Sequence, residues 1–119
     1  MGTYTIMLNG DTDQIGPTAN GLEYALDLDG HGHDVEVYFD GVGTRWLGEL
    51  TANPEHPVNE YYEQARESGL IAGACEYCAG AFGATEGVRE SGVDFVGDGG
   101  HGPDLGKLAT EGSAFITLG

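Results

Sequence analysis

Residues 70–88, LIAGACEYCAGAFGATEGV, lead from a continuous apolar run into a segment with the pattern of a helix. We predict a buried strand over Leu70–Ala74 and a helix that begins near Cys78 and continues through Val88. Two cysteines, Cys75 and Cys78, lie at this junction in a C-x-x-C spacing. A buried strand that leads directly into a helix is typical of α/β proteins, whose parallel strands are covered on both faces.

The rest of the chain repeats this alternation of strand and helix. Further strands are predicted at residues 3–8, 34–39, 93–96 and 114–118, and further helices at 15–26, 44–50, 58–65 and 103–111. With 119 residues the chain has the usual size of one domain, and no linker or internal repeat divides it. These features predict a single domain over residues 1–119, a three-layer α/β/α sandwich with a mostly parallel five-stranded sheet.

The charge balance is strongly acidic, with 20 Asp and Glu residues against 4 Lys and Arg and a formal net charge of -16. No single acidic block accounts for this charge. Self-repulsion weakens a compact state in low salt, whereas in molar salt the Debye length falls to about 3 Å and the repulsion is largely screened. The composition therefore predicts a protein adapted to high salt. The alternative interpretation is an acidic protein that binds a basic partner.

The composition also argues against several classes of function. No apolar run reaches the length of about 18 residues that crosses a bilayer, and the start MGTYTIMLNG lacks the features of a signal peptide. We therefore expect a cytoplasmic protein with no membrane partner. Four basic residues cannot form a stripe that binds nucleic acid, so no direct nucleic-acid partner is expected. The loop GDGGHG at residues 97–102 lacks the Lys and Ser/Thr of a phosphate-binding loop, and no cofactor is predicted.

The C-x-x-C pair is the main candidate for chemistry, because in a cytosolic protein such a pair is more often redox-active, sulfur-handling or metal-binding than structural. Reactive groups of α/β proteins gather where strands end and helices begin, and both cysteines follow the third predicted strand. We expect the Cys75 sulfur to lie uncovered at the strand tip, where the free N–H groups of the next helix stabilise a thiolate. Glu76 and the general negative field oppose this activation. The alternative interpretation is that both cysteines only pack the end of a strand.

Other polar residues that follow predicted strands are candidates for substrate binding. Asp11 follows the first strand, Asp40 the second and His101 the fourth, so each can reach the edge of the sheet that holds the cysteines. The alternative for Asp11 and Asp13 is a turn that carries surface charge. A zinc site would need two more ligands besides the cysteines, with four histidines available and no second C-x-x-C, so no metal is predicted.

Four stretches of the chain carry a resemblance to a known family: MLNGDTDQIG, GLEYALDLDGHGHDVEVYFDGVG, LIAGACEYCAGAFGATEGV and PDLGKLATEGSAFITLG. Together they resemble the DsrE/DsrF-like family, which also includes TusD-type and YchN-type proteins, and the acidic composition is similar to that of a haloarchaeal member. The resemblance implies a five-stranded α/β/α fold, assembly into trimers or hexamers, and in some members a cysteine persulfide that carries sulfur in a relay. By this match Cys75 is the sulfur acceptor, and Cys78 is a second thiol that resolves a persulfide or closes a disulfide.

The cysteine segment departs from the family pattern at one position. Many members have C-x-x-C-x-x-A-R-G, whereas this chain has CEYCAGAFG, with Phe82 in place of Arg.

The leading hypothesis is a sulfur-relay protein, a possible sulfurtransferase, that works between donor and acceptor proteins. Two alternatives stay open: a thiol-disulfide or peroxide-handling protein that uses the same pair, and a non-enzymatic oligomeric binding module. Trp46, Tyr61 and Tyr62 are candidates for a subunit contact, and burial in the core is the alternative for Tyr61 and Tyr62.

Overall fold

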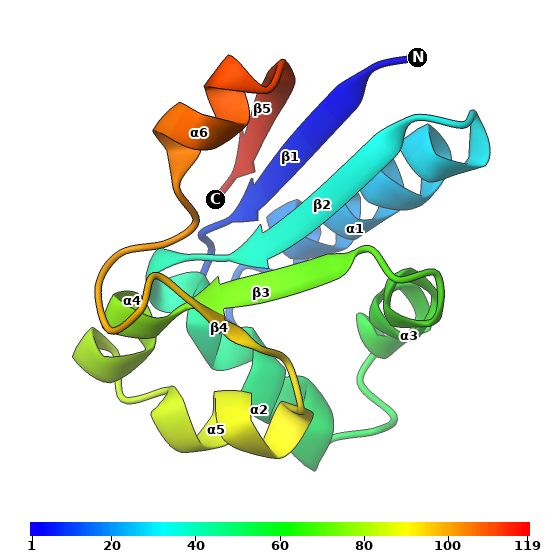
Figure 1. Cartoon of the computed structure of the whole chain (residues 1–119). Coiled ribbons are helices and arrows are strands. Elements are labelled where there is room, and N and C mark those ends of the chain that lie inside the picture. The colour runs from blue at the N-terminus through cyan, green and yellow to red at the C-terminus, as the bar shows by residue number, and fades with distance from the viewer.

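The computed structural model describes residues 1–119, in which strands and helices alternate along the chain (Figure 1). In chain order the elements are β1 (Thr3–Leu8), α1 (Ile15–Gly30), β2 (Asp34–Phe39), a short 3-10 helix (Gly41–Thr44), α2 (Arg45–Ala52), α3 (Asn59–Glu67), β3 (Ile71–Cys75), α4 (Glu76–Ala81), α5 (Thr85–Ser91), β4 (Phe95–Val96), α6 (Leu105–Thr110) and β5 (Ser113–Leu118). Every predicted strand and helix is present, and one predicted helix is divided in two. No helix combines the length and the apolar character that crossing a membrane requires.

All five strands are parallel and form one sheet in the order β4-β3-β2-β1-β5. β1 pairs with β2 from Thr3 opposite Asp34 to Leu8 opposite Phe39, and it pairs with β5 along its whole length. The predicted fold class, an α/β sandwich around a five-stranded parallel sheet, is confirmed. Because the strands run the same way, their carboxyl ends and the loops that follow them lie along one edge of the sheet.

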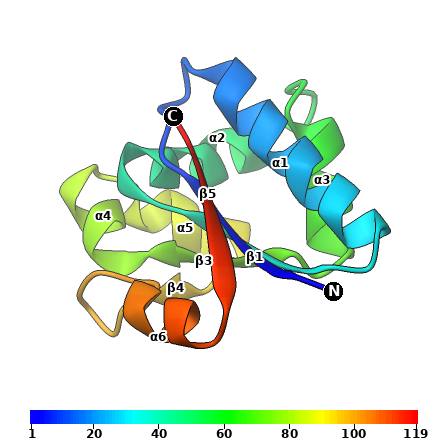
Figure 2. The same cartoon turned by 90° about the horizontal axis from the view of Figure 1, so that it is seen from above.

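The helices cover the two faces of the sheet unequally. α1 and α3 pack against each other on one face, where α1 contacts β1, β2 and β5, and α6 lies on the opposite face beside β5 (Figure 2). The chain path explains this arrangement. The steps from β1 to β2, β3 and β4 all move in one direction across the sheet, so right-handed crossovers leave their helices on one side. The return from β4 to β5 runs the other way and places α6 on the other side.

The hydrophobic core lies between the sheet and the larger set of helices. Ile6 and Leu8 of β1 and Val37 and Phe39 of β2 point into it, and all four are fully buried. Alternate residues of a strand point to the same face, and the register of β1 with β2 sets these pairs side by side. Leu22 of α1 packs on them from above the sheet. Each such side chain contributes about 1.5–3 kcal/mol to folding through its removal from water.

Trp46 of α2 belongs to this core, and the prediction of a subunit contact at this residue is wrong. Its side chain is fully buried, its Nε1 donates a hydrogen bond to the carbonyl of Gly10 at 3.0 Å, and its ring meets His56 edge-on at 5.4 Å. The indole N–H can be buried because the turn after β1 supplies this acceptor. Tyr62 is buried in the same core, and Tyr61 packs against it from a half-buried position.

The single helix predicted over residues 78–88 is interrupted, and the structure has α4 and α5 in its place. Gly83, between the two helices, has a left-handed backbone with a φ of 68°. The N–H of Ala84 donates to the carbonyl of Ala79 at 2.7 Å, which is the usual closing bond of a helix that ends at a left-handed glycine. The sequence pattern misses this break because apolar residues continue at helical spacing on both sides of it. The short α4 that results carries the second cysteine.

Candidate functional site

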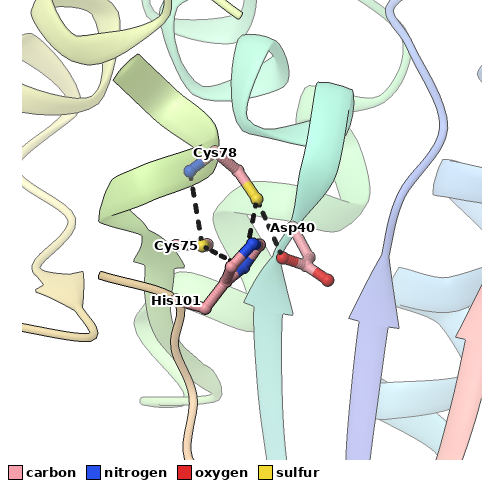
Figure 3. Close-up of side chains that lie close together, drawn as sticks. All are labelled: Asp40, Cys75, Cys78 and His101. Carbon is pink, nitrogen blue, oxygen red and sulfur yellow. Dashed lines mark hydrogen bonds between the residues drawn. The ribbon is translucent and has the colours of Figure 1, made fainter. Parts of the chain in front are cut away.

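Four polar side chains meet at the carboxyl edge of the sheet (Figure 3). Asp40 directly follows β2, Cys75 is the last residue of β3, Cys78 lies in α4 and His101 lies in the loop after β4. One donor atom from each residue lies within 4.8 Å of the donor atoms of the other three. These four residues are termed the cysteine cluster. The structure thus brings two of the predicted substrate-binding residues, Asp40 and His101, together with both cysteines.

Cys75 caps the start of α4. Its Sγ accepts a hydrogen bond from the backbone N–H of Cys78 at 3.4 Å and lies 3.5 Å from Nδ1 of His101. The expectation of an uncovered sulfur is wrong, because Cys75 is 0 % exposed. Its cover is polar, since half-buried Asp40 and exposed His101 lie beside the two sulfurs. Cys75 therefore has the predicted place at a helix start, beneath polar side chains that separate it from solvent.

Cys78 differs from Cys75 in its hydrogen bonds. Its Sγ donates to Oδ1 of Asp40 at 3.5 Å and lies 3.7 Å from Nδ1 of His101. Burial, followed by the neighbouring Cys75 and Asp40, raises the pKa of the Cys78 thiol to about 12, and the backbone N–H of Gly41 acts in the opposite direction. Gly41 follows Asp40 directly with a φ of 55°, a left-handed turn that glycine adopts without strain. At neutral pH Cys78 is therefore a thiol whose proton points to a carboxylate.

The Gly-rich loop after β4 holds His101 over the two sulfurs. The N–H of Gly99 donates to Oε1 of Glu76 at 2.9 Å, and the N–H of Tyr77 donates to the carbonyl of Gly100 at 3.2 Å. The ring of Tyr77 lies 4.6 Å from the imidazole of His101, centre to centre. Sequence reasoning misses these roles of Glu76 and Tyr77, because the loop that they contact is more than twenty residues away along the chain.

Asp11 lies outside the cysteine cluster. Its Oδ2 forms a salt bridge with Arg45 of α2 at 3.2 Å. Nε of Arg45 also donates to the carbonyl of Phe82 at 3.0 Å, and its guanidinium lies 5.8 Å from the centre of the Phe82 ring. The guanidinium of Arg45 therefore lies beside Phe82, the residue that stands where the family pattern C-x-x-C-x-x-A-R-G has Arg. A role of Asp11 in substrate binding stays a prediction.

An open groove on the α6 side of the sheet reaches the cysteine cluster. Its lining includes Glu36 and Tyr38 of β2, Lys107 of α6 and His101, so the imidazole borders both the groove and the two sulfurs. The hydroxyl of Tyr38 donates to Oε2 of Glu36 at 3.1 Å. Burial and this carboxylate raise the pKa of Tyr38 to about 12. Tyr38 is thus a neutral polar group in the wall of a groove that His101 also lines.

This arrangement of groups is suited to three kinds of chemistry. A cysteine sulfur next to an imidazole can act as a nucleophile. Two thiols within reach of each other can exchange with a disulfide. Sulfur, nitrogen and oxygen donors that converge on one point can bind a thiophilic metal ion. All three use residues of the cysteine cluster, and they differ in what the Cys75 sulfur binds or attacks.

Comparisons with known proteins identify the fold and the family of the chain. A comparison with curated proteins gives no match to the chain. Among solved structures, the chain is similar to a conserved protein of unknown function from Bacteroides thetaiotaomicron, with a TM-score of 0.65 and 19% sequence identity, over 95% of this chain and 93% of that one. At this identity the likeness shows a shared fold. The sequence model of the DsrE/DsrF-like family matches residues 3–118, nearly the whole chain. The chain therefore belongs to the DsrE/DsrF-like family.

Proposed function

We propose that the protein carries sulfur as a persulfide on Cys75, in a relay from a donor protein to an acceptor protein. The main support is the setting of the Cys75 sulfur, which accepts the N–H of Cys78 at 3.4 Å and lies 3.5 Å from an imidazole nitrogen of His101. A thiol beside an imidazole can pass its proton to the ring and become a nucleophile. Membership of the DsrE/DsrF-like family supports the same function, because the family includes sulfur carriers.

In the first step the Cys75 thiolate attacks the outer sulfur of a donor persulfide, R–S–SH. A bond forms between Sγ and that sulfur, the S–S bond of the donor breaks, and the donor leaves as the thiolate R–S⁻. His101 takes the proton from Cys75 before the attack and can give it to the departing thiolate. The products are a persulfide on Cys75 and a donor thiol, so the step consumes no separate oxidant or reductant.

Release of the sulfur can follow two routes. In one, a thiolate of the acceptor attacks the outer sulfur and Cys75 leaves as a thiolate. In the other, Cys78 attacks Sγ of Cys75, hydrosulfide leaves, and the two cysteines form a disulfide that a dithiol reductant must reduce before the next cycle. In this route Asp40, whose Oδ1 lies 3.5 Å from Sγ of Cys78, takes the proton of Cys78 as that sulfur attacks. Asp40 is therefore needed only for the second route.

Sulfur exchange requires the Gly-rich loop to move, because Cys75 is 0 % exposed. His101 is the exposed residue beside the sulfur, and the groove along α6 reaches the same imidazole. A donor segment that enters this groove and displaces His101 would reach Sγ of Cys75. These features support an approach of the donor from the face of the sheet that carries α6.

We expect the chain to form a homo-oligomer, a trimer or a hexamer, as the family resemblance implies. Three features support this: β5 is an edge strand, its Phe115 is 40% exposed, and Leu105 of the neighbouring α6 is 48% exposed. Contact between copies of the chain would cover these apolar side chains. Light scattering in molar KCl is expected to give the mass of three or six chains. The mass of a single chain would contradict the proposed assembly and leave the chemistry of Cys75 unaffected.

The relay predicts that the reduced protein gains one sulfur atom per chain from a small persulfide donor such as glutathione persulfide. The mass of the intact protein should increase by one sulfur, and dithiothreitol should remove this sulfur as hydrosulfide, because persulfide formation is reversible. Protein whose thiols have been blocked with iodoacetamide is the control and should gain none. Reduced protein that gains no sulfur from an excess of donor would contradict the relay.

The close approach of the two sulfurs also supports a second function, thiol-disulfide exchange. Their Sγ atoms lie within 4.8 Å of each other in a C-x-x-C pair. This function requires a reversible disulfide between Cys75 and Cys78 with a potential of about -180 to -270 mV. Titration against glutathione or dithiothreitol buffers, with alkylation of the remaining thiols, measures the reduction potential of this disulfide. A disulfide that forms reversibly in this range, together with no gain of sulfur from a persulfide donor, would favour exchange over the relay.

A further inference from the structure

Three of the distances between donor atoms in the cysteine cluster equal those expected around a tetrahedral zinc ion. Sγ of Cys75 lies 3.5 Å from Nδ1 of His101, and Sγ of Cys78 lies 3.7 Å from the same nitrogen and 3.5 Å from Oδ1 of Asp40. Zinc bonds of about 2.3 Å to sulfur and about 2.0–2.1 Å to nitrogen or oxygen place tetrahedral donors about 3.6 Å apart. These three distances therefore match those of a zinc site, and the remaining pairs of donor atoms lie within 4.8 Å of each other.

We infer that the cysteine cluster binds one zinc ion. Cys75 and Cys78 would bind as thiolates, His101 through Nδ1 and Asp40 through one carboxylate oxygen. Two sulfurs, an imidazole and a carboxylate are donors that zinc accepts, whereas magnesium and calcium require sets of oxygen donors. A closed set of four protein ligands is typical of zinc that stays bound, because no position is left for a substrate.

The surroundings of the cluster also suit a cation. The three salt bridges of the molecule involve none of these four residues, so no Lys or Arg neutralises the carboxylate of Asp40 or a thiolate beside it. The backbone N–H of Cys78 donates to Sγ of Cys75 at 3.4 Å, and the ring of Tyr77 packs on the imidazole of His101. Such contacts outside the ligand set fix the ligands and tune their affinity for a metal.

The proton balance of zinc binding is simple. One Zn²⁺ displaces one proton from each thiol into solvent, and no electron is transferred. The two positive charges of the ion replace the two protons that leave, so the net charge of the cluster does not change and the ion lies directly beside the carboxylate of Asp40. Bound zinc also occupies the sulfur lone pairs that would attack a persulfide, so zinc and carried sulfur are expected to exclude each other. That exclusion rests on the proposed function, whereas zinc binding itself does not.

The test uses the reduced full chain in molar KCl, freed of metal with a chelator and without any persulfide donor. Titration with Zn²⁺ against a coloured chelator should give one tight site per chain. Co²⁺ in place of Zn²⁺ should give the intense visible bands of tetrahedral cobalt together with a cobalt–thiolate charge-transfer band. Saturation with Zn²⁺ should protect both cysteines from iodoacetamide, a measurement that needs no variant and so does not depend on variants that fold.

Single substitutions identify the ligands. We expect each of three variants, Cys78→Ser, Asp40→Asn and His101→Gln, to weaken zinc binding at least about 10-fold. Even the loss of a residue that only hydrogen-bonds to a metal ligand lowers metal affinity about 10- to 100-fold. Asp13→Asn and His31→Gln make the same changes at exposed positions outside the cluster and are expected to leave zinc affinity unchanged. The cobalt charge-transfer band should weaken in Cys78→Ser and persist in Asp40→Asn.

Two results would overturn the inference. One is the absence of tight zinc binding by the reduced wild-type chain, or a cobalt spectrum without thiolate bands. The other is a zinc affinity that Asp40→Asn and His101→Gln lower no more than the two control variants do. Because these measurements contain no sulfur donor, a chain that gains sulfur but fails to bind zinc would disprove this inference alone. A chain that binds zinc but gains no sulfur would disprove the relay alone.

Discussion

The Cys75→Ser variant is expected to lose the capacity to accept sulfur from a persulfide donor, with a fall in rate of at least about a thousandfold. Sγ of Cys75 is the atom that lies 3.5 Å from the imidazole of His101 and accepts the N–H of Cys78, and a hydroxyl in its place is a far weaker nucleophile. The rate of sulfur gain, followed by the mass of the intact protein at timed intervals, measures this effect.

The Cys78→Ser variant is the matched control, because it makes the same exchange at the other member of the pair. The backbone N–H that donates to Cys75 stays in place, and a serine hydroxyl can donate to Asp40 as the thiol does. We expect sulfur acceptance near the wild-type rate and slower release as hydrosulfide, because the disulfide route is lost. Acceptance that survives in Cys75→Ser, or that disappears equally in both variants, would contradict the assignment of roles.

Both variants need a check on folding, since the two cysteines are buried. A buried hydroxyl without a full set of partners costs about 1–3 kcal/mol, a large share of the stability of a small domain. Circular dichroism and thermal unfolding in molar KCl show whether each variant keeps the native fold. The comparison of rates is then made on folded protein.

The second large expected effect is on stability, which should rise steeply with salt. The net charge is -16, no acidic side chain is buried, and only three of the 20 acidic residues lie in a salt bridge. Two like charges about 10 Å apart in water repel by about 0.4 kcal/mol before screening, and many such pairs exist on this surface. Between about 0.1 M and about 2 M KCl we expect the melting temperature to rise by more than about 10 °C.

A variant with fewer charges separates charge screening from the general effect of salt on apolar surface. Glu60, Glu63 and Glu67 lie on the exposed side of α3, so their replacement by Gln leaves the core intact. This triple variant is expected to be more stable than the wild type in low salt and to depend less on KCl. A melting temperature that does not change with KCl, or equal salt dependence in both proteins, would contradict adaptation to high salt.

Much of the fold could be predicted from the sequence, because local patterns determine the elements and parallel strands follow from their alternation. The strand over residues 34–39 is an example, since the alternation of DVEVYF fixes both its bounds and the face that it buries. The order of strands in the sheet has no local signal, because it depends on which strands pair across long separations. The break at Gly83 cannot be predicted from the pattern, because apolar residues continue at helical spacing on both sides of this glycine.

The candidate site could be predicted in part. Asp40, Cys75 and His101 follow successive strands, so their meeting at one edge of a parallel sheet follows from topology alone. The burial of Cys75 could not be predicted, because it depends on how the Gly-rich loop folds back over the strand end. The hydrogen bonds that hold this loop come from Glu76 and Tyr77, residues that carry no recognisable motif.

The role of Cys75 is decided by locating the carried sulfur within one peptide. Trypsin cleaves after Arg66 and Arg89, so residues 67–89 contain both cysteines, and fragment ions that break the chain between Cys75 and Cys78 tell them apart. After incubation with glutathione persulfide and alkylation, we expect one added sulfur on fragments that contain Cys75. An added sulfur found only on Cys78, or on neither residue, would contradict this role.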